Sequence, residues 1–394
     1  MVEVDEKENN CISEVDNILK HGNPVDFFVK TISTMHLGDD WIKKALLLAA
    51  FSHYVQRPNN LIHILVSGKS ERGKSSVVQS LLECLPCDVY EVWSGFSEKY
   101  LFYACGDNEK ILSNKILYVD DDVFVDSAFV RNIKTPDEAG VVQYGTVKDQ
   151  KPLDLVIDGT PVVFESKVNS HIDTQDKTRS LVVIIDESEE HRRKVRDFII
   201  DKECSNGKKV DNKQDIIICR GICKDLTRLG KKKVIIPSYL KEKIPDGVYG
   251  RSLKRFIGFI RCSCFINQFQ RETKDGGIVA NEKDLEVPLE IYANSLGSEI
   301  LGLDNLDVKI LEGIQGLKSA DYDKIAVIIK RCRGTAWSRS KNLAEKGLVY
   351  ITEENRKDFV NVNEKGREAL KLLNKLKITG KKARDVDSEE VFPA

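Results

Sequence analysis

The feature that most constrains this chain is a glycine-bounded stretch at residues 68–75, with the letters GKSERGKS. It fits the spacing G-x-x-x-x-G-K-[ST]. The apolar run at 61–66 predicts a buried parallel strand, and residues 76–83 predict the helix that follows it. Glycines let successive backbone N–H groups turn inward, and the helix dipole adds about half a positive charge at the same end. The stretch therefore predicts a site for the phosphates of a nucleotide.

Each position of this loop has an expected role. Lys74 is expected to reach the β- and γ-phosphates of ATP, and Ser75 to supply an oxygen to Mg²⁺. The predicted nucleotide-binding residues are Gly68, Lys69, Ser70, Glu71, Arg72, Gly73, Lys74, Ser75 and Ser76. A surface loop that carries these letters by chance is the alternative, and the flanking strand and helix disfavour it.

The composition is typical of a large soluble chain. Its 394 residues, 41% of them hydrophobic, are enough for two or three domains. No apolar run approaches the ~18 residues that would span a membrane, and the acidic start is unlike a secretory signal, so we expect a cytoplasmic protein without membrane contact. Ten cysteines without regular spacing predict reduced thiols. The spacings of Cys84 with Cys87 and of Cys262 with Cys264 favour core packing over zinc binding.

The order of apolar and polar runs predicts an α/β fold, with a P-loop ATPase core, an N-terminal helical cap and a helical lid. Apolar runs alternate with polar helical stretches from residue 61 to about 186, as in a parallel sheet covered by helices on both faces. Residues 1–10 are expected to be disordered, whereas 25–32 and 41–51 predict helices. Helices expected at 188–202 and 251–271 form the lid. The expected domains are 1–58, 59–298 and 299–378, followed by a disordered acidic tail at 379–394.

Three carboxylates follow a second apolar run, residues 115–119. Mg²⁺ bound to a nucleotide needs a carboxylate in its outer shell, and hydrolysis needs a second one to orient water. We assign Asp120 to magnesium and Asp121 to the attacking water. Because a third acid, Asp122, follows directly, the assignment of these two roles among the three residues stays open by one position. Three acids that merely open a solvated turn are the alternative.

Three further stretches, at 140–149, 158–166 and 176–188, follow in order. With the two motifs above, they resemble the AAA+ helicase module of phage and plasmid primase-helicases, a relative of minichromosome-maintenance and superfamily 3 helicases. The resemblance runs from about residue 46 to residue 271. It implies ATP and Mg²⁺ as cofactors, Ser166 as a sensor of the γ-phosphate, and Arg251 as a candidate second sensor.

The same resemblance makes Arg179 the arginine that reaches the nucleotide of a neighbouring subunit. Such an arginine stabilises the charge on the transferring phosphoryl group. An arginine that acts between subunits implies a homo-oligomer, with a hexameric ring as one form. An ordinary surface arginine before a strand is the alternative.

Residues 140–157 alternate apolar and polar positions on both sides of the letters KDQKP at 148–152, which predicts a β-hairpin with a basic tip. In the family that the chain resembles, this hairpin projects into a central channel. Lys148 and Lys151 are therefore candidates to hold a phosphate of single-stranded DNA. A surface hairpin whose lysines keep its tip soluble is an equal alternative.

The C-terminal part resembles a winged helix-turn-helix domain. Helices expected at 307–317, 321–330 and 336–346 precede strands expected at 348–352 and 359–362 and a closing helix at 364–377. Residues 300–384 contain 19 Lys and Arg against 11 Asp and Glu, a local charge of +8. The expected DNA contacts are Arg333, Trp337, Arg339, Ser340 and Lys341 on the third helix, with Arg356 and Lys357 at the wing tip. A core position for Trp337, and a protein-interaction or packing role for the domain, are the alternatives.

The leading hypothesis is an ATP-dependent DNA helicase or translocase in the replication of a virus, plasmid or other mobile element. Single-stranded DNA would bind at the hairpin and duplex DNA at the winged helix. The first sixty residues are too few for a primase, so we expect a separate primase partner. One alternative is an ATP-switched replication initiator or transcription regulator without unwinding activity, and another is a small-molecule kinase. Arg179 and the basic hairpin argue against a kinase but do not separate helicase from regulator.

Overall fold

The chain consists of two compact units in the computed structural model. The structure describes residues 2–69, 73–93, 109–120, 131–148, 151–168, 178–204, 212–245, 248–299, 303, 305–317, 319–354, 357–364, 366–367 and 370. The first unit comprises Met1–Pro245 and Tyr249–Ile291, and the second comprises Asp246–Val248 and Tyr292–Ala394. In the described part of the chain, no helix combines the length and the apolar character needed to cross a membrane.

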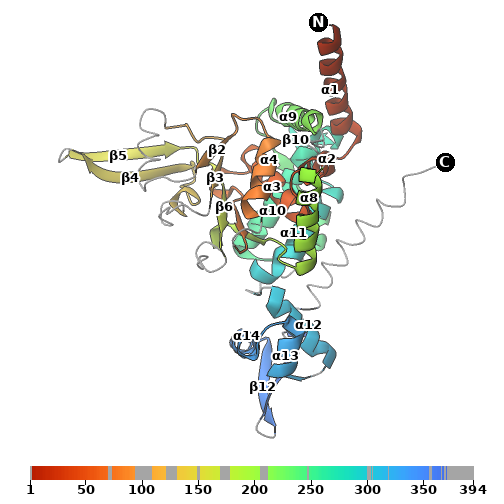
Figure 1. Ribbon diagram of the computed structural model, residues 1–394. Helices are drawn as coiled ribbons and strands as arrows, with labels where there is room; N and C mark the ends of the chain where they lie inside the picture. Colours follow the sequence, from red (N-terminus) through yellow and green to blue (C-terminus); the bar gives the residue numbers. More distant parts are fainter. Residues whose placement is uncertain are drawn as a thin grey trace. The chain divides into compact units, whose positions relative to one another are not determined.

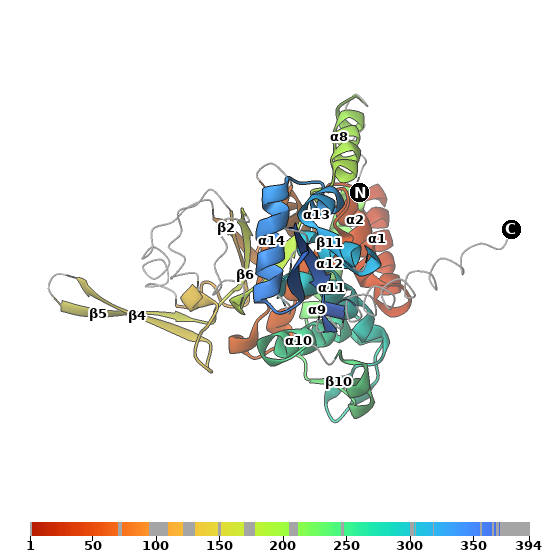
Figure 2. The same ribbon diagram turned by 90° about the horizontal axis from the view of Figure 1, so that it is seen from below.

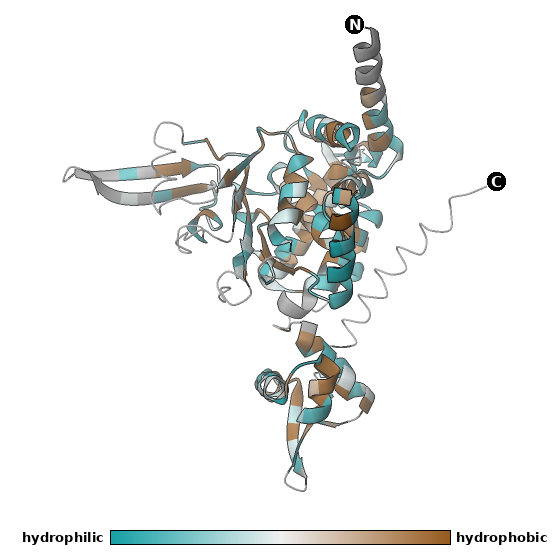
Figure 3. Ribbon diagram, in the orientation of Figure 1, coloured by the Kyte–Doolittle hydropathy of each residue, from teal (hydrophilic) through white to brown (hydrophobic). Residues whose placement is uncertain are grey.

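The first unit is built on a parallel sheet of five strands (Figure 1). In spatial order these are β2 (Tyr90–Trp93), β3 (Ile116–Val119), β6 (Val162–Lys167), β1 (Ile64–Ser67) and β7 (Leu181–Ile184). Every neighbouring pair is parallel. β1, β3 and β7 are short, mostly apolar and buried, as parallel strands covered on both faces must be. β6 is buried as well but changes from apolar residues to Glu165, Ser166 and Lys167 at its end. Hydrophobic segments gather in the region of the sheet in Figure 3. This confirms the expected α/β class with a parallel central sheet.

The helices around this sheet are α1 (Val2–His21), α2 (Pro24–Ser33), α3 (Asp40–Ala50), α4 (Lys74–Glu83), α9 (Lys213–Thr227) and α10 (Gly250–Ile266). α4 packs on β6, while α1 packs against α9 and α2. α3 is the central one, because it packs against β1, α4 and α10 and its run Leu46, Leu47 and Leu48 is fully buried. The 3₁₀ turns Ser52–Tyr54 and Pro58–Asn60 then lead into β1.

The expected disorder at the N-terminus is wrong for residues 2–10, which form the first half of α1. The second half of this helix packs against α9 and buries Val15, Ile18 and Leu19. Once tertiary packing has fixed that part, each further residue adds one hydrogen bond without a new nucleation cost. The helix therefore extends through a charged segment that would not fold alone.

A two-stranded antiparallel hairpin lies between β3 and β6 in the sequence. It consists of β4 (Val141–Lys148) and β5 (Lys151–Asp158), with Lys148 opposite Lys151 at the turn and Val141 opposite Asp158 at the root. The alternation in the sequence predicted this hairpin. It extends away from the sheet and its helices in both views (Figures 1 and 2).

The rest of the first unit contains α8 (Glu189–Cys204) and the small sheet of β8 (Val234–Ile235), β9 (Thr273–Lys274) and β10 (Gly277–Val279). A 3₁₀ turn, Ser238–Lys243, lies between β8 and α10, and α11 (Lys283–Glu299) begins in this unit. α8 begins and ends close to the range expected from sequence, and none of its residues is buried.

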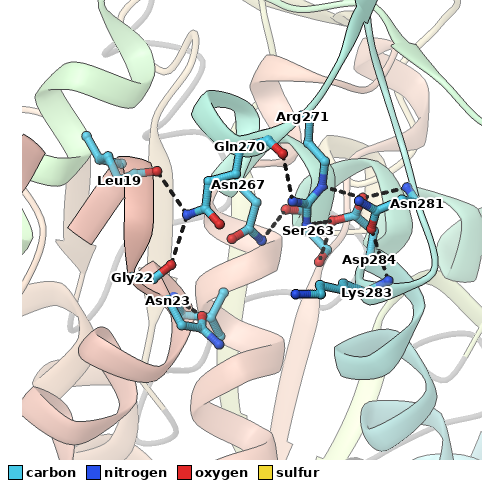
Figure 4. A network of polar contacts seen from close by, with 11 residues as sticks. Leu19, Gly22, Asn23, Ser263, Asn267, Gln270, Arg271, Asn281, Lys283 and Asp284 are labelled. Atoms are coloured by element: carbon cyan, nitrogen blue, oxygen red, sulfur yellow. Dashed lines mark hydrogen bonds and ion pairs between the residues drawn. The ribbon is translucent and has the colours of Figure 1, made fainter. Parts of the chain in front are cut away.

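The helix expected at 251–271 ends earlier, at Ile266, and continues as the 3₁₀ turn Gln268–Gln270. Asn267 Nδ2 donates to the Ser263 carbonyl at 2.9 Å and so satisfies a carbonyl of the last helical turn. Gln270 Nε2 donates to the carbonyls of Leu19, at 3.0 Å, and Gly22, at 2.9 Å, at the end of α1 (Figure 4). These side chains make the turn a junction between α1 and α10.

The second unit contains α12 (Asn305–Leu317), α13 (Tyr322–Ile329) and α14 (Arg333–Glu345). β11 (Ala320–Asp321), β12 (Val349–Glu354) and β13 (Lys357–Val362) form an antiparallel sheet in the order β11-β13-β12. The buried side chains of Ile310, Ile314, Ile325 and Leu343 make a core of their own. The closing helix expected at 364–377 falls largely outside the described residues.

Most of the described cysteines of the first unit pack inside it. The expected core packing is confirmed for Cys84, Cys262 and Cys264, which are buried, and is wrong for Cys87, which is exposed. Burial raises the pKa of the Cys262 and Cys264 thiols, which keeps them protonated. The nine cysteines that the structure describes are all free thiols.

Two buried histidines tie the entry of β1 to β6. His53 Nε2 accepts the N–H of Val162 at 3.2 Å, and His63 Nδ1 accepts the N–H of Val163 at 3.0 Å. Both rings must be neutral at these nitrogens to accept. Burial lowers the pKa of His53 to about 4, with Lys231 adding to the effect, and burial also lowers the pKa of His63 well below its usual value.

This linkage predicts that the first unit loses stability in mild acid. An unfolded histidine takes up a proton near pH 6.5, whereas folded His53 does so only near pH 4, so the stability present above pH 6.5 falls as the pH drops from 6.5 to 4. We expect a loss of about 3 kcal/mol from His53 alone. Urea unfolding of Trp337→Phe protein, in which Trp41 and Trp93 of the first unit report by fluorescence, measures it. His53→Gln retains an acceptor without a titrating proton and should flatten this dependence; an equally steep profile in that variant would contradict it.

Candidate nucleotide-binding site

The glycine-bounded loop connects β1 to α4 at the carboxyl end of the sheet. Gly73 precedes α4 with φ of 88°, in the left-handed region that favours glycine. A Cβ at this position would also lie 3.1 Å from His36 Cε1. Both the backbone angle and the space therefore require glycine here. Three of the predicted nucleotide contacts, Ser70, Glu71 and Arg72, lie outside the described residues.

Lys74 lies in the first turn of α4 and is buried. Its Nζ donates to the Lys69 carbonyl at 3.1 Å, so the ammonium group folds back over the loop. The Lys69 N–H in turn donates to Glu187 Oε1 at 2.8 Å, and Lys69 Nζ lies 3.7 Å from Glu187 Oε2. Glu187 follows β7 and holds the start of the loop, a contact that the sequence did not indicate.

Ser75 and Asp120 meet although they are 45 residues apart. Ser75 Oγ donates to Asp120 Oδ1 at 2.8 Å. The two residues meet because parallel β1 and β3 end at the same edge of the sheet, on either side of β6. Asp121 and Asp122 lie outside the described residues.

A hydroxyl and a carboxylate oxygen at this distance fit Mg²⁺, which takes oxygen ligands and usually one or two carboxylates together with nucleotide phosphates. Within the described ranges, no cluster of three or more His, Cys, Asp or Glu side chains could hold a metal by itself. The donor set of Ser75 and Asp120 therefore fits a metal ion that arrives with a nucleotide.

Sequence reasoning missed Tyr118, which joins Asp120 to the predicted sensor Ser166. Tyr118 Oη donates to Asp120 Oδ1 at 3.0 Å and lies 2.9 Å from Ser166 Oγ. The side chains of Tyr118 and Ser166 are both buried. Burial raises the pKa of Tyr118 to about 12, so its hydroxyl keeps its proton. The sequence signal for Tyr118 was its place two residues before Asp120, because residues i and i+2 of a strand lie on the same side.

Ser76 contacts the N-terminal helices. Its Oγ lies 3.1 Å from His36 Nδ1, in the turn between α2 and α3. His36 Nε2 lies 3.2 Å from Asp39 Oδ2, and Asp39 Oδ1 accepts the N–H of Asp186 at 3.1 Å. This turn therefore holds the phosphate-loop helix and the end of β7 together. No local pattern connects His36 to a serine 40 residues further along the chain.

Arg179 and Arg251 lie together, at the other end of the sheet. Arg179 stands two residues before β7, and the first residue of β7, Leu181, is level with the start of β1. The phosphate loop begins about 13 Å further along β1. Arg251 Nη1 lies 3.4 Å from Thr178 Oγ1, and Arg255 Nη2 donates to the Thr178 carbonyl at 3.3 Å. Hence Arg251 lies beside the Arg179 segment, while Ser166 lies beside the phosphate loop.

The predicted DNA-contacting residues of α14 fall into two groups. Arg333, Trp337 and Lys341 are exposed and, at a spacing of four, share one face. Trp337 is 45% exposed, with Lys341 Nζ 4.4 Å above its ring, so it is not a core residue. Ser340, which we expected on the exposed face, is fully buried. Arg339 Nη1 lies 3.3 Å from Asp307 Oδ1 and ties α14 to α12.

The remaining predicted DNA contacts lie on strands. The backbones of Lys148 and Lys151 are paired at the end of the hairpin. Lys357 is exposed at the start of β13. Arg356 lies outside the described residues.

Comparison with known proteins identifies the N-terminal part. The family described as the MTBMA_p00010 P-loop domain matches residues 9–228, more than half of the chain. A relative, the uncharacterized protein MTBMA_p00010 of Methanothermobacter marburgensis (strain Marburg), is 25% identical over 302 residues, which cover 74% of this chain and 37% of the relative. The chain thus spans little more than a third of that relative's length.

Among solved structures, one described as "Mechanism for regulation of DNA binding of Bordetella bronchiseptica BpsR by 6-hydroxynicotinic acid" matches 23% of this chain and 69% of its own. The identity is 13% and the TM-score is 0.18, a likeness too low to show a shared fold.

Replacing Lys74 by alanine should lower ATP affinity by about 100-fold or more, because a charged contact with the phosphates contributes up to about 3 kcal/mol. Binding of a fluorescent ATP analogue measures the loss, and circular dichroism checks the fold. Lys194→Ala removes an exposed lysine of α8 and serves as the control that keeps full affinity. Equal affinity in Lys74→Ala and wild-type protein would contradict the assignment of this loop.

Proposed function

The chain belongs to the family of the MTBMA_p00010 P-loop domain, and from this premise we propose that it is an ATP-hydrolysing motor that acts on DNA. The proposed role is a helicase or translocase in the replication of a virus, plasmid or other mobile element. The observation that carries it is the contact of Ser75 with Asp120, 2.8 Å apart at the carboxyl ends of β1 and β3. This contact brings a phosphate loop and a metal-binding carboxylate into one site.

In this proposal each residue of the site has a defined task. Lys74 binds the β- and γ-phosphates, and Asp121 orients the attacking water. Mg²⁺, when bound through Ser75 and Asp120, neutralises charge on the phosphate oxygens. Backbone N–H groups of the loop and the N-terminus of α4 bind the remaining phosphate charge. Positioning and charge stabilisation, rather than covalent catalysis, supply the rate.

Arg179 supports an oligomeric motor. It stands two residues before β7, at the amino end of the sheet, whereas the phosphate loop of its own chain follows the carboxyl end of β1. We propose that it reaches the nucleotide of a neighbouring copy, in a homo-oligomer for which a hexameric ring is one form. Arg255, which is buried and donates to the Thr178 carbonyl, fixes the backbone next to Arg179. Arg251 joins the same segment and is proposed to act on the same neighbouring site.

The hairpin supports the proposal that the motor moves along DNA. It lies in the sequence between Asp120, which follows β3, and Ser166 on β6, so we propose that movement at the site reaches the root of the hairpin. Lys134, just before β4, pairs with Glu165 of β6 in a buried ion pair. We propose that Lys148 and Lys151 at the turn bind phosphates of single-stranded DNA, which the hairpin moves when the nucleotide state changes.

For the second unit we propose a winged-helix domain that binds duplex DNA. Three helices followed by the antiparallel β12–β13 pair support it. On α14 the exposed Arg333, Trp337 and Lys341 would face the major groove, while Arg356 and Lys357 would reach phosphates. Free thiols fit a reducing, cytoplasmic location. Priming would come from a separate primase.

A second candidate function is an ATP-switched replication initiator or transcription regulator without unwinding activity. The observation that favours it is the exposed basic face of α14, which lies in a unit with its own core. Such a unit can recognise duplex DNA without any motor. The two candidates therefore differ in how ATP turnover responds to DNA.

A motor should hydrolyse ATP faster when single-stranded DNA is present. We expect at least a tenfold stimulation, which requires only about 1.4 kcal/mol of differential stabilisation, and a phosphate-release assay with and without a single-stranded oligonucleotide measures it. Lys148→Gln/Lys151→Gln protein should keep its basal rate and lose the stimulation. Arg333→Gln/Lys341→Gln protein is the matched control, which should lose duplex affinity but keep the stimulation. Turnover that ignores single-stranded DNA while duplex binding depends on ATP would favour the regulator.

Arg179→Ala should bind ATP normally and hydrolyse it about 10³-fold more slowly or worse, as expected for an arginine that contacts the transferring phosphoryl group. Mixing it with Lys74→Ala protein tests the action between subunits. A mixed oligomer contains interfaces at which an intact Lys74 site faces an intact Arg179, so some turnover should return. No recovery in an oligomer shown by mass spectrometry to be mixed would indicate that Arg179 is structural.

A further inference from the structure

A chain of hydrogen bonds connects two strands of the sheet with the helix that follows the phosphate loop. It consists of Ser166 on β6, Tyr118 and Asp120 on and after β3, and Ser75 on α4, and is named the hydroxyl relay below. The separations are 2.9 Å from Ser166 Oγ to Tyr118 Oη, 3.0 Å from Tyr118 Oη to Asp120 Oδ1 and 2.8 Å from Ser75 Oγ to Asp120 Oδ1. All three are ordinary hydrogen-bond lengths.

The protons of the hydroxyl relay have one consistent arrangement. An ionised carboxylate only accepts, so both Tyr118 and Ser75 donate to Asp120. The Tyr118 hydroxyl has a single proton, which it donates to Asp120. Ser166 must therefore donate its own proton to the Tyr118 oxygen. The Ser166 proton thus points to Tyr118, and it is not directed at a γ-phosphate.

Burial makes this arrangement rigid. Tyr118 and Ser166 are buried, so neither hydroxyl can exchange its partner for water without cost. Tyr118 is held on both sides, because β3 pairs with β2 and with β6. The Asp120 carboxylate is consequently fixed by two donors that approach the same oxygen from different elements.

We propose that Tyr118 is a positioning residue that orients the Asp120 carboxylate toward the metal of a bound metal–nucleotide complex. Ser166 acts through Tyr118, rather than as an independent sensor. The inference rests on the proposed nucleotide-dependent function and deepens it, since it assigns the metal affinity of the site to a tyrosine that touches neither metal nor nucleotide.

The test uses Tyr118→Phe, which removes one oxygen and keeps the buried ring. The probe is Mn²⁺ with a non-hydrolysable ATP analogue, and electron paramagnetic resonance of free Mn²⁺ gives the affinity without any turnover. We expect Mn²⁺ affinity in the ternary complex to fall about tenfold, the usual effect of losing one hydrogen bond to a charged group. Affinity for the analogue in EDTA, which depends on Lys74 and the loop, should not change. Tyr90→Phe, on β2 next to β3, is the matched control.

A double-mutant cycle separates the two roles of Ser166. If Ser166 acts through Tyr118, Ser166→Ala lowers Mn²⁺ affinity by itself but adds nothing in the Tyr118→Phe background. An additive loss would show an independent contact with the nucleotide and overturn the relay. Unchanged Mn²⁺ affinity in Tyr118→Phe would overturn it as well.

Two further outcomes are distinguishable. If Tyr118→Phe also loses metal-free affinity, its sheet has been disturbed, and Ser166→Ala, which leaves the tyrosine ring in place, then decides through its own Mn²⁺ affinity. If the wild-type protein binds neither the analogue nor its Mn²⁺ complex, the proposed function itself fails and the inference fails with it.

Discussion

The bond between Ser75 and Asp120 depends on a single topological fact, the position of β6 between β1 and β3. Two strands that are separated by a third strand, as β1 and β3 are, lie about 10 Å apart. Two short side chains can bridge this distance only when one of them projects from a helix that starts above the sheet. α4 provides that start, because Gly73 turns the chain into it with φ of 88°. The strand order therefore decides which hydroxyl meets which carboxylate, and it places the end of β6 beneath the contact.

β6 divides two kinds of chemistry between its faces. Ser166 lies toward Tyr118, whereas its neighbour Glu165 faces the opposite way, as consecutive residues of a strand do. Glu165 pairs with Lys134 and, at 3.3 Å, with Lys167. Lys134 Nζ also donates to Ser180 Oγ at 2.8 Å, next to Arg179. Removing one partner of a buried ion pair costs about 3–5 kcal/mol. Through Lys134, Glu165 thus links the segment before the hairpin and the residue before β7 to β6, the strand that also carries Ser166 of the hydroxyl relay.

Local sequence patterns were sufficient to predict the main helices and strands and about half of the residues of the candidate nucleotide-binding site. The loop at 68–75 and the strand before Asp120 carry their signals within about ten residues, as glycine spacing and as an apolar run. The β4–β5 hairpin carries its alternation over residues 141–158. His36 and Glu187 carry no such signal, because their partners lie 40 and 118 residues away. For Tyr118 the signal was only its place two residues before Asp120, which does not indicate that its hydroxyl contacts both Asp120 and Ser166. Ser340 failed for a related reason: helical spacing says which residues share a face, and only packing against neighbouring elements says which face is buried. The sequence therefore predicts which residues form the nucleotide-binding site, whereas the contacts that position these residues appear only in the tertiary structure.

The two ends of the sheet have opposite requirements. At the carboxyl end, N–H groups, a lysine and the N-terminus of α4 prepare a site for phosphates. At the amino end, Arg251 and Arg255 both contact Thr178, beside Arg179. The guanidinium groups of Arg251 and Arg255 lie beside one residue and repel each other unless an anion or carbonyl dipoles offset the repulsion. The Thr178 carbonyl, which accepts from Arg255, offsets part of it. The phosphate loop begins about 13 Å further along β1. The two basic regions therefore lie at opposite ends of one sheet, an arrangement compatible with the proposed action of Arg179 between copies.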